Sequence, residues 1–306
     1  MNNSDLSIPG SIVLRKIALA LMAASLALSL SACSKPAGSE MPTVASPQFG
    51  TVPEINFPAA PPPEAPVMKV LDDGDGKGEA VKDGDLVVVD YYGKVWGGDL
   101  MPDSTITDAA GPRAISLANP PIEGWKELSG VKVGQRVLLI LPPNKAYGDM
   151  GASSIGVKKG DTLAYVVDVR LAVSADAASK FQVTPTNNPL PEGISVEADG
   201  QGAYTVNAAA AGAYPSEQAT AVYATGDGPA VEAGQGVIVK RVSTDWNGHT
   251  TAADWNAGEL ISVSADSLGL ADLPLGSLVL VVTPATPTAD PQAELLQLVS
   301  AYDTNR

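Results

Sequence analysis

The sequence has very few of the residues that most enzymes use for chemistry. One cysteine (Cys33) and one histidine (His249) occur in 306 residues. A Ser/His/Asp triad away from His249, a Cys/His zinc site and an internal disulfide framework therefore lack their atoms. Aromatic residues make up only 5% of the chain, so each of them is informative. These shortages exclude most hydrolases and metalloenzymes, and we expect neither a metal nor a cofactor.

Basic residues are also few. Nineteen of them face 34 acidic residues, for a formal net charge of −15. A protein that binds the phosphate backbone does so with basic side chains that release counterions, so nucleic acid is not an expected partner. Hydrophobic residues make up 45% of the chain and charged residues 17%, which supports a folded core. The length suits two domains with connecting segments.

The N-terminal segment has the pattern of a signal peptide. Residues 1–16 end in Arg15 and Lys16, and the fourteen residues 17–30 carry no charge. A helix of that length would cover about 21 Å, which is short of the ~30 Å hydrocarbon layer of a membrane. The pattern therefore favours a cleaved export signal over a permanent membrane span.

The single cysteine lies directly after this segment. The residues Leu30-Ser31-Ala32-Cys33 resemble the bacterial lipobox, which implies cleavage before Cys33 and attachment of diacylglycerol to its sulfur. A stray cysteine beside an ordinary cleavage site is the alternative. We expect residues 1–32 to be a lipoprotein signal peptide. The mature protein would then be exported and lipid-anchored to the outer face of a bacterial membrane, with no other membrane contact.

Residues 33–66 form the next distinct segment. Nine prolines lie between positions 34 and 66, and the segment ends in Pro61-Pro62-Pro63-Glu64-Ala65-Pro66. Proline cannot continue a helix or a central strand. We therefore expect a Pro-rich linker in extended polyproline II conformation, although a proline-binding partner is an alternative role.

The composition changes at Val67 to short apolar runs separated by turn residues. The runs predict four strands and one short helix: strands at 86–92, 113–117, 135–141 and 162–171, and a helix at 121–128. This pattern predicts an α+β domain over residues 67–173, with an antiparallel curved sheet wrapped around the helix.

A set of short motifs in this domain resembles a known family. They are Tyr91-x-Gly93, Ile122-x-Gly124-Trp125, Gly130-Val131-Lys132-Val133-Gly134-Gln135-Arg136, Pro142-Pro143, Ala146-Tyr147-Gly148 and Asp161-Thr162-Leu163. Their order and spacing resemble those of FKBP-type peptidyl-prolyl cis/trans isomerases. The resemblance covers about a third of the chain.

The chemistry of such an isomerase agrees with the shortages described above. Resonance gives the amide a rotation barrier of ~18–20 kcal/mol, and X-Pro bonds populate both isomers. The twisted amide has lost resonance and is less dipolar than the planar ground state. A dry pocket with aromatic walls therefore favours the twisted form, and it needs no nucleophile, metal or tuned histidine.

The resemblance also implies roles for individual residues. Trp125 would form the floor under the proline ring, with Tyr91 and Tyr165 as walls. Ile122 would donate its backbone N–H to a substrate carbonyl, and the Tyr147 hydroxyl would donate to another. The remaining implied residues are the rim carboxylate Asp103 and the substrate contacts Met101, Pro121 and Val157. If these side chains instead pack as an ordinary core, the site does not exist.

Some positions depart from the family pattern. Met101-Pro102 and Arg113 stand where the family usually has phenylalanines, and Lys158 and Lys159 stand where a proline pair is common. Each large apolar side chain lost from the wall forfeits about 1.5–3 kcal/mol of burial, so we expect reduced affinity and turnover.

The second half of the chain repeats parts of the first. Gly226-Asp227-Gly228 matches Gly74-Asp75-Gly76, and Trp246-Asn247-Gly248 lies 150 residues after Trp96-Gly97-Gly98. A third match aligns residues 275–284 with 133–142. Three matches in the same order predict a second FKBP-like domain at residues 220–306.

The predicted site residues are not repeated. In this alignment Tyr91 becomes Arg241, Trp125 becomes Ser267 and Tyr147 falls at Ala289. The second domain is therefore expected to be degenerate, with a last strand at Glu294–Tyr302. The connecting segment 174–219 is expected to supply an added edge strand near residues 189–196, and a short helix is possible at 207–213.

Two functions are compatible with these observations. The first is a membrane-anchored prolyl isomerase acting on proline-containing exported polypeptides, which could also bind macrolides of the FK506 or rapamycin type. The second is a surface lipoprotein that binds peptides or acts as a chaperone with little or no turnover. A solute receptor of a transport system is a remoter alternative, since it would need two larger α/β lobes.

Overall fold

The structure is a computed structural model that describes residues 40–98, 104–107, 111–247, 249, 255 and 259–305. Residues Pro42–Arg306 form one compact unit. The predicted signal peptide and Cys33 lie outside the described residues. Among the described residues, no helix is both long and apolar enough to span a membrane.

The first half contains an antiparallel sheet of five strands in the order β3-β6-β7-β4-β5. The strands are β3 (Val67–Asp72), β4 (Leu86–Val95), β5 (Arg113–Ser116), β6 (Arg136–Leu141) and β7 (Leu163–Val173). The four strands predicted from sequence are confirmed, and β3 adds a fifth at one edge. Val and Leu fill these strands because branched side chains pack well on a pleated surface.

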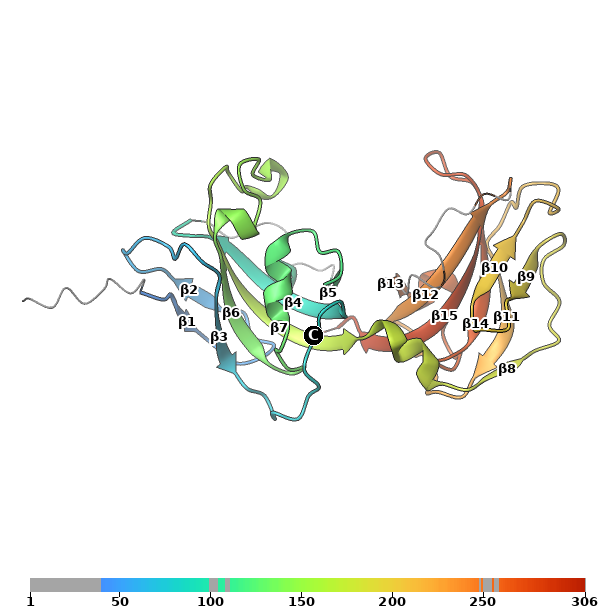
Figure 1. Cartoon of the computed structure of the whole chain (residues 1–306), viewed down its shortest axis with the longest axis horizontal. Coiled ribbons are helices and arrows are strands. Elements are labelled where there is room, and N and C mark those ends of the chain that lie inside the picture. The colour runs from blue at the N-terminus through green and yellow to red at the C-terminus, as the bar shows by residue number, and fades with distance from the viewer. Residues whose placement is uncertain are drawn as a thin grey trace, which may run out of the picture. The chain divides into compact units, whose positions relative to one another are not determined.

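One face of this sheet is covered by the 3₁₀ helix η2 (Glu123–Leu128), as Figure 1 shows in green in front of the strands. The predicted helix is confirmed, although it begins two residues later than expected. Alternate residues of β4, namely Val87, Val89 and Tyr91, point to this face and belong to the buried core. Short 3₁₀ turns lie in the connections: η1 (Thr105–Thr107), η3 (Pro143–Lys145), η4 (Ser153–Ile155) and η5 (Ala175–Lys180).

The opposite face of the sheet is covered in part by a hairpin from the proline-rich segment. Strands β1 (Thr43–Ala45) and β2 (Glu54–Asn56) pair antiparallel, and Ile55 is buried. The expectation of a purely extended spacer over residues 33–66 is therefore wrong for this part. The prolines at 42, 47 and 53 flank the paired residues and remove no hydrogen bond from the ladder.

The second half contains a sheet of six strands in the order β13-β12-β15-β14-β11-β8. Its elements are β8 (Val183–Pro185), β11 (Ala219–Gly226), β12 (Gln235–Asp245), β13 (Leu260–Ser264), the helix α2 (Ala265–Leu268), β14 (Leu278–Thr283) and β15 (Gln292–Asp303). Without β8, this order repeats that of the first sheet, with each strand in the corresponding place. The last strand lies where the sequence predicted it.

A second hairpin precedes strands β11 to β15, as the first hairpin precedes the first sheet. It consists of β9 (Ser195–Ala198) and β10 (Tyr204–Asn207), and β10 contacts β12 and β15. The added edge strand is β8, whereas residues 189–196 lead into the hairpin; the predicted position of the edge strand was wrong. The possible helix at 207–213 is also absent, since Gly212 has a left-handed φ of 70° and the Asn207 side chain accepts from the Ala209 N–H.

The glycine motif that the two halves share makes the same close approach in each. A Cβ on Gly74 would lie 2.5 Å from the Gly134 carbonyl oxygen, and a Cβ on Gly226 would lie 2.6 Å from the Ser277 nitrogen. Only glycine lets the two loops meet at this distance.

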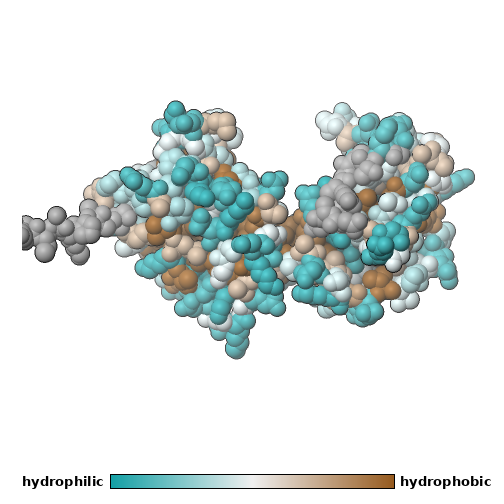
Figure 2. Space-filling model, viewed as in Figure 1, coloured by the Kyte–Doolittle hydropathy of each residue, from teal (hydrophilic) through white to brown (hydrophobic). Residues whose placement is uncertain are grey.

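Hydrophilic side chains cover most of the face drawn in Figure 2, with hydrophobic residues in small groups.

Candidate active site

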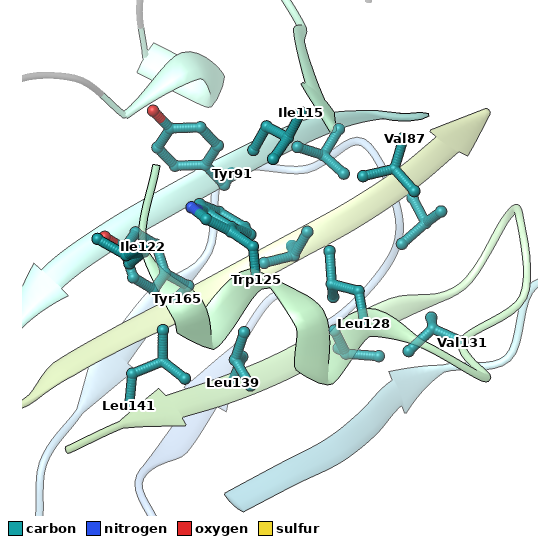
Figure 3. Packing of buried hydrophobic residues seen from close by; sticks show 14 of the residues in the cluster. Val87, Tyr91, Ile115, Ile122, Trp125, Leu128, Val131, Leu139, Leu141 and Tyr165 are labelled. Atoms are coloured by element: carbon teal, nitrogen blue, oxygen red, sulfur yellow. The ribbon is translucent and has the colours of Figure 1, made fainter. Parts of the chain in front are cut away.

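Three aromatic rings from three different elements meet on the η2 side of the first sheet. Trp125 from η2 lies with its ring centroid 5.4 Å from that of Tyr91 in β4 and 5.1 Å from that of Tyr165 in β7. The two tyrosine rings are 5.7 Å apart in an edge-to-face arrangement. Figure 3 shows the three side chains grouped together. The predicted floor and walls therefore come together, in the geometries that aromatic rings prefer.

A glycine brings the tryptophan down onto the sheet. A Cβ on Gly124 would collide with the Leu141 side chain of β6 and would lie 2.8 Å from the Lys145 carbonyl oxygen. The Ile122-x-Gly124-Trp125 motif thus has a packing reason, since a larger residue would lift η2 away from the strands.

Ile122 and Pro121 lie directly before η2. Ile122 has extended backbone angles (φ −136°, ψ 145°) and a buried side chain within the aromatic cluster. Pro121 is exposed, so it lies at the surface beside the cluster. The backbone N–H groups at the start of a helix have no partner within the helix. This position therefore suits the predicted hydrogen bond from the Ile122 N–H to a substrate carbonyl.

The loop between β6 and β7 covers another side of the cluster. Val157 is buried in the core, and Tyr147 packs against it half-buried. Backbone hydrogen bonds in both directions join Ala152 and Val157, at 2.8 and 3.0 Å. Gly148 donates to the Pro143 carbonyl at 2.8 Å and thereby fixes the turn that carries Tyr147.

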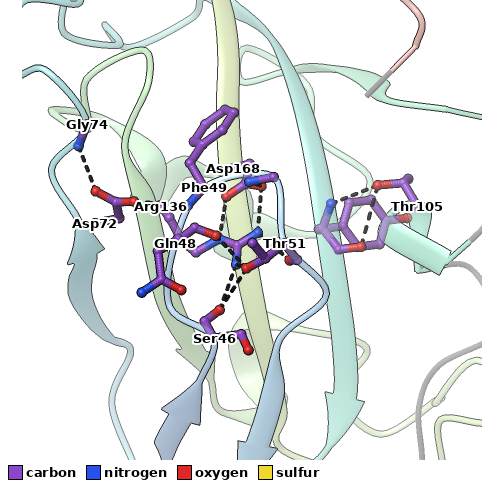
Figure 4. Close-up of polar contacts among 11 residues, drawn as sticks. Ser46, Gln48, Phe49, Thr51, Asp72, Gly74, Thr105, Arg136 and Asp168 are labelled. Carbon is purple, nitrogen blue, oxygen red and sulfur yellow. Dashed lines mark hydrogen bonds and ion pairs between the residues drawn. The ribbon is translucent and has the colours of Figure 1, made fainter.

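Two predicted residues, Met101 and Asp103, lie outside the described residues. The chain that follows them is held firmly. The Thr105 hydroxyl accepts from the Tyr91 N–H at 2.7 Å and donates to Asp90 at 3.1 Å, and the Ser104 hydroxyl accepts from the Gly93 N–H at 2.8 Å. Thr105 is drawn in Figure 4. These hydroxyls accept hydrogen bonds from backbone N–H groups of β4 beyond the residues that pair with β5. Sequence analysis did not identify this role.

Sequence analysis also missed Ile115 as a member of the cluster. Ile115 is buried in β5 and lies near Tyr91 in Figure 3. Its place in the alternating run 113–117 was the available signal. Arg113, two residues earlier in the same strand, is exposed.

A buried ion pair lies on the opposite face of the sheet. Arg136 and Asp168 are cross-strand partners, and their charged atoms approach to 2.6 and 2.7 Å. Arg136 also donates to the Ser46 carbonyl, the Thr51 hydroxyl and the Thr51 carbonyl of the first hairpin turn. Gly50 donates its N–H to Asp168 at 2.9 Å. Figure 4 shows Arg136 and Asp168 beside Ser46 and Thr51. The hairpin therefore completes the hydrogen bonding of both charges.

The second sheet has a different set of residues at the corresponding positions. Arg241 lies in β12 and pairs with Glu294 at 3.2 Å, and Ser267 lies in α2. Ala289 lies in the short connection between β14 and β15. Among the described residues, these positions hold no aromatic ring.

The aromatic cluster is closely covered in this structure. Trp125 and Tyr91 are 4% exposed and Tyr165 is 2% exposed. Four surface cavities lined by described residues include none of these three rings. Tyr147 and Ile155 are among the half-buried side chains that pack against the cluster.

Comparison with known proteins gives several sequence matches. A model of the family described as FKBP-type peptidyl-prolyl cis-trans isomerase matches residues 77–170. An FK506-binding protein of Streptomyces anulatus is 34% identical over 119 residues, which are 38% of this chain and 94% of that protein. The FKBP-type peptidyl-prolyl cis-trans isomerase FkpA of Escherichia coli (strain K12) is 39% identical over 106 residues, which are 33% of this chain and 37% of that protein.

A solved structure also matches in part. The crystal structure of FkpA from Escherichia coli covers 35% of this chain and 48% of that chain, at 35% identity and a TM-score of 0.31. The assignment rests on the sequence matches, because the Streptomyces protein is aligned over nearly its whole length. The chain belongs to the family of FKBP-type peptidyl-prolyl cis-trans isomerases.

Proposed function

We propose that this protein catalyses cis/trans isomerisation of X-Pro bonds in exported polypeptides, at the cluster formed by Tyr91, Trp125 and Tyr165. The observation that carries the proposal is the meeting of three aromatic rings from β4, η2 and β7 within 5.1–5.7 Å of one another. An apolar aromatic surface of this kind binds a proline ring and excludes water from the amide beside it.

The proposed mechanism uses desolvation and orientation. The planar amide is more dipolar than the twisted one, so removal of water raises its free energy more than that of the twisted state. In the proposal, the Ile122 N–H and the Tyr147 hydroxyl donate to substrate carbonyls and hold the chain on both sides of the bond. Asp103, Met101, Pro121 and Val157 keep the rim and contact roles that the family resemblance implies.

The test is prolyl isomerase activity of residues 42–306, the compact unit, on a short X-Pro peptide. Tyr147→Phe removes one hydrogen-bond donor, worth about 0.5–1.5 kcal/mol, so we expect kcat/KM to fall about 2- to 13-fold. Trp125→Leu should lower it further, since the floor under the proline ring is lost. Tyr92→Phe is the matched control, because Tyr92 follows Tyr91 on the opposite face of β4.

Two results would contradict the proposal. The wild type would add nothing to the uncatalysed rate, or Tyr147→Phe and Tyr92→Phe would change kcat/KM equally. Circular dichroism of each variant separates loss of the site from loss of the fold.

A second candidate function is peptide binding with little or no turnover. The observation that favours it is the low exposure of the three rings, 2–4%. Tight binding of an FK506-type macrolide or of a proline-containing peptide, with no acceleration of isomerisation, would support this candidate instead.

We also propose that the second sheet is an FKBP-like repeat that has lost its site. The repeated strand order, the preceding hairpin and the short helix α2 support this proposal. The replacement of Tyr91 by Arg241 and of Trp125 by Ser267 removes the aromatic floor and one wall. In this proposal the repeat extends the surface available to a client and performs no catalysis.

The protein would work at the outer face of a bacterial membrane, held through Cys33.

A further inference from the structure

One arginine beside the aromatic cluster has no acidic partner among the described residues. The structure describes four arginines, and three of them form ion pairs: Arg136 with Asp168, Arg170 with Asp90, and Arg241 with Glu294. Arg113 forms none, and its side chain is exposed. In a chain with a net charge of −15, an exposed guanidinium with no ion pair among the described residues is a distinctive feature.

The sheet register places Arg113 next to the site. Arg113 in β5 lies directly opposite Val89 in β4, and Ile115 lies opposite Val87. Alternate residues share a face, so Arg113 is on the same face as Ile115, which belongs to the cluster. Tyr91 is the next residue of β4 on this face. Diagonal neighbours of this kind are about 7–8 Å apart, which an extended arginine side chain spans.

Two lysines near the cluster have acidic partners of their own. Lys126 pairs with Glu123 at 3.2 Å, and Lys159 pairs with Asp149 at 3.1 Å. Glu259 lines a surface groove together with Arg113 but forms no ion pair with it in the described structure. Among the described residues, no carboxylate is therefore paired with Arg113.

We infer that Arg113 makes the site prefer substrates with an acidic residue next to the proline. This inference rests on the isomerase function proposed above. A guanidinium and a carboxylate at an exposed position attract one another modestly, and typical exposed pairs correspond to about a 1.4- to 5-fold change in an equilibrium. We expect kcat/KM for a Glu-Pro peptide to exceed that for the matching Gln-Pro peptide by this factor at low salt.

The test is exchange NMR on residues 42–306, which needs no coupled protease and accepts any sequence. The peptides are Ala-Glu-Pro-Phe, Ala-Gln-Pro-Phe and Ala-Lys-Pro-Phe, with a second set that carries the charge after the proline. The preference for Glu over Gln in either set should disappear in Arg113→Gln and persist in Arg113→Lys. It should also disappear at 1 M salt, where the screening length falls to about 3 Å. Lys69→Gln is the matched control, since it removes an exposed cation from β3 at the other edge of the sheet.

The outcomes separate the inference from the function on which it rests. No acceleration with any peptide would contradict the isomerase function. Acceleration with equal rates for Glu and Gln peptides, or a Glu preference unchanged in Arg113→Gln, would contradict the role of Arg113 and leave the isomerase function standing.

Discussion

At the scale of single residues, the buried ion pair is a feature on which stability depends. The side chains of Arg136 and Asp168 are 0% and 1% exposed, and each has further hydrogen-bond partners in the first hairpin. Removing one member of such a pair leaves the other charge buried without compensation. By contrast, the side chains of Lys159 and Asp149 are 70% and 87% exposed, and water screens their charges.

We therefore expect Asp168→Asn to lower the free energy of unfolding by about 3–5 kcal/mol. Asp149→Asn should change it by less than about 1 kcal/mol. Urea denaturation followed by circular dichroism measures both. If the two variants lose similar stability, the pair does not have the role assigned to it.

At the scale of elements, the first hairpin is an integral part of the first half of the chain. A fragment that begins at Val67 would lack the groups that Ser46, Gly50 and Thr51 supply to the ion pair. The hairpin is also tied to the edge strand β3, because the Phe49 N–H donates to Asp72 at 2.9 Å. This hydrogen bond, followed by that from Gly74, lowers the pKa of the Asp72 carboxyl below its ordinary value.

The lowered pKa predicts how docking of the hairpin depends on pH. A carboxyl whose pKa is depressed in the folded state stabilises the fold above its unfolded pKa of about 3.9. That contribution is lost as the pH falls through the folded value. We expect the Phe49 amide to lose protection from hydrogen exchange as the pH falls below about 4.

Asp72→Asn is the comparison for this prediction, because its side chain does not titrate. In this variant the Phe49 amide should have weaker protection at pH 7 and a smaller change toward acid. Equal pH dependence in wild type and variant would show that another group controls the hairpin. NMR detection of the single amide distinguishes local release from global unfolding.

At the scale of the whole molecule, the excess of acidic residues is compatible with the proposed export of the protein. A net charge of −15 keeps such a surface soluble, and it also discourages association with polyanions. In the proposal, a short cleaved signal and a lipid-modified cysteine would account for the N-terminal pattern of the sequence.

The anchor has a direct test. Mass spectrometry of the mature protein should find an N-terminus at Cys33 that carries diacylglycerol and a further acyl chain. Cys33→Ser should release the protein from the membrane fraction and leave prolyl isomerase activity in solution unchanged. An unmodified Cys33 in the mature protein would contradict the anchor.

The sequence by itself determined four strands of the first sheet, the last strand of the second, the helix at Trp125 and the three rings of the aromatic cluster. Local patterns were sufficient there, because alternation of apolar residues defines the buried face of a strand and a glycine before Trp125 marks a close approach. The motif set at Tyr91, Trp125 and Tyr147 also identified the family without a structure.

Only the tertiary structure decided how the proline-rich segment and the polar residues are used. Residues 43–56 form a hairpin because its turn supplies hydrogen bonds to charges that lie 85 to 118 positions later in the chain. The same holds for Thr105, whose hydroxyl completes β4, and for Arg113, whose place beside Tyr91 follows from strand register. Such contacts join residues far apart in the sequence, so they cannot be predicted from local patterns of apolar and polar residues.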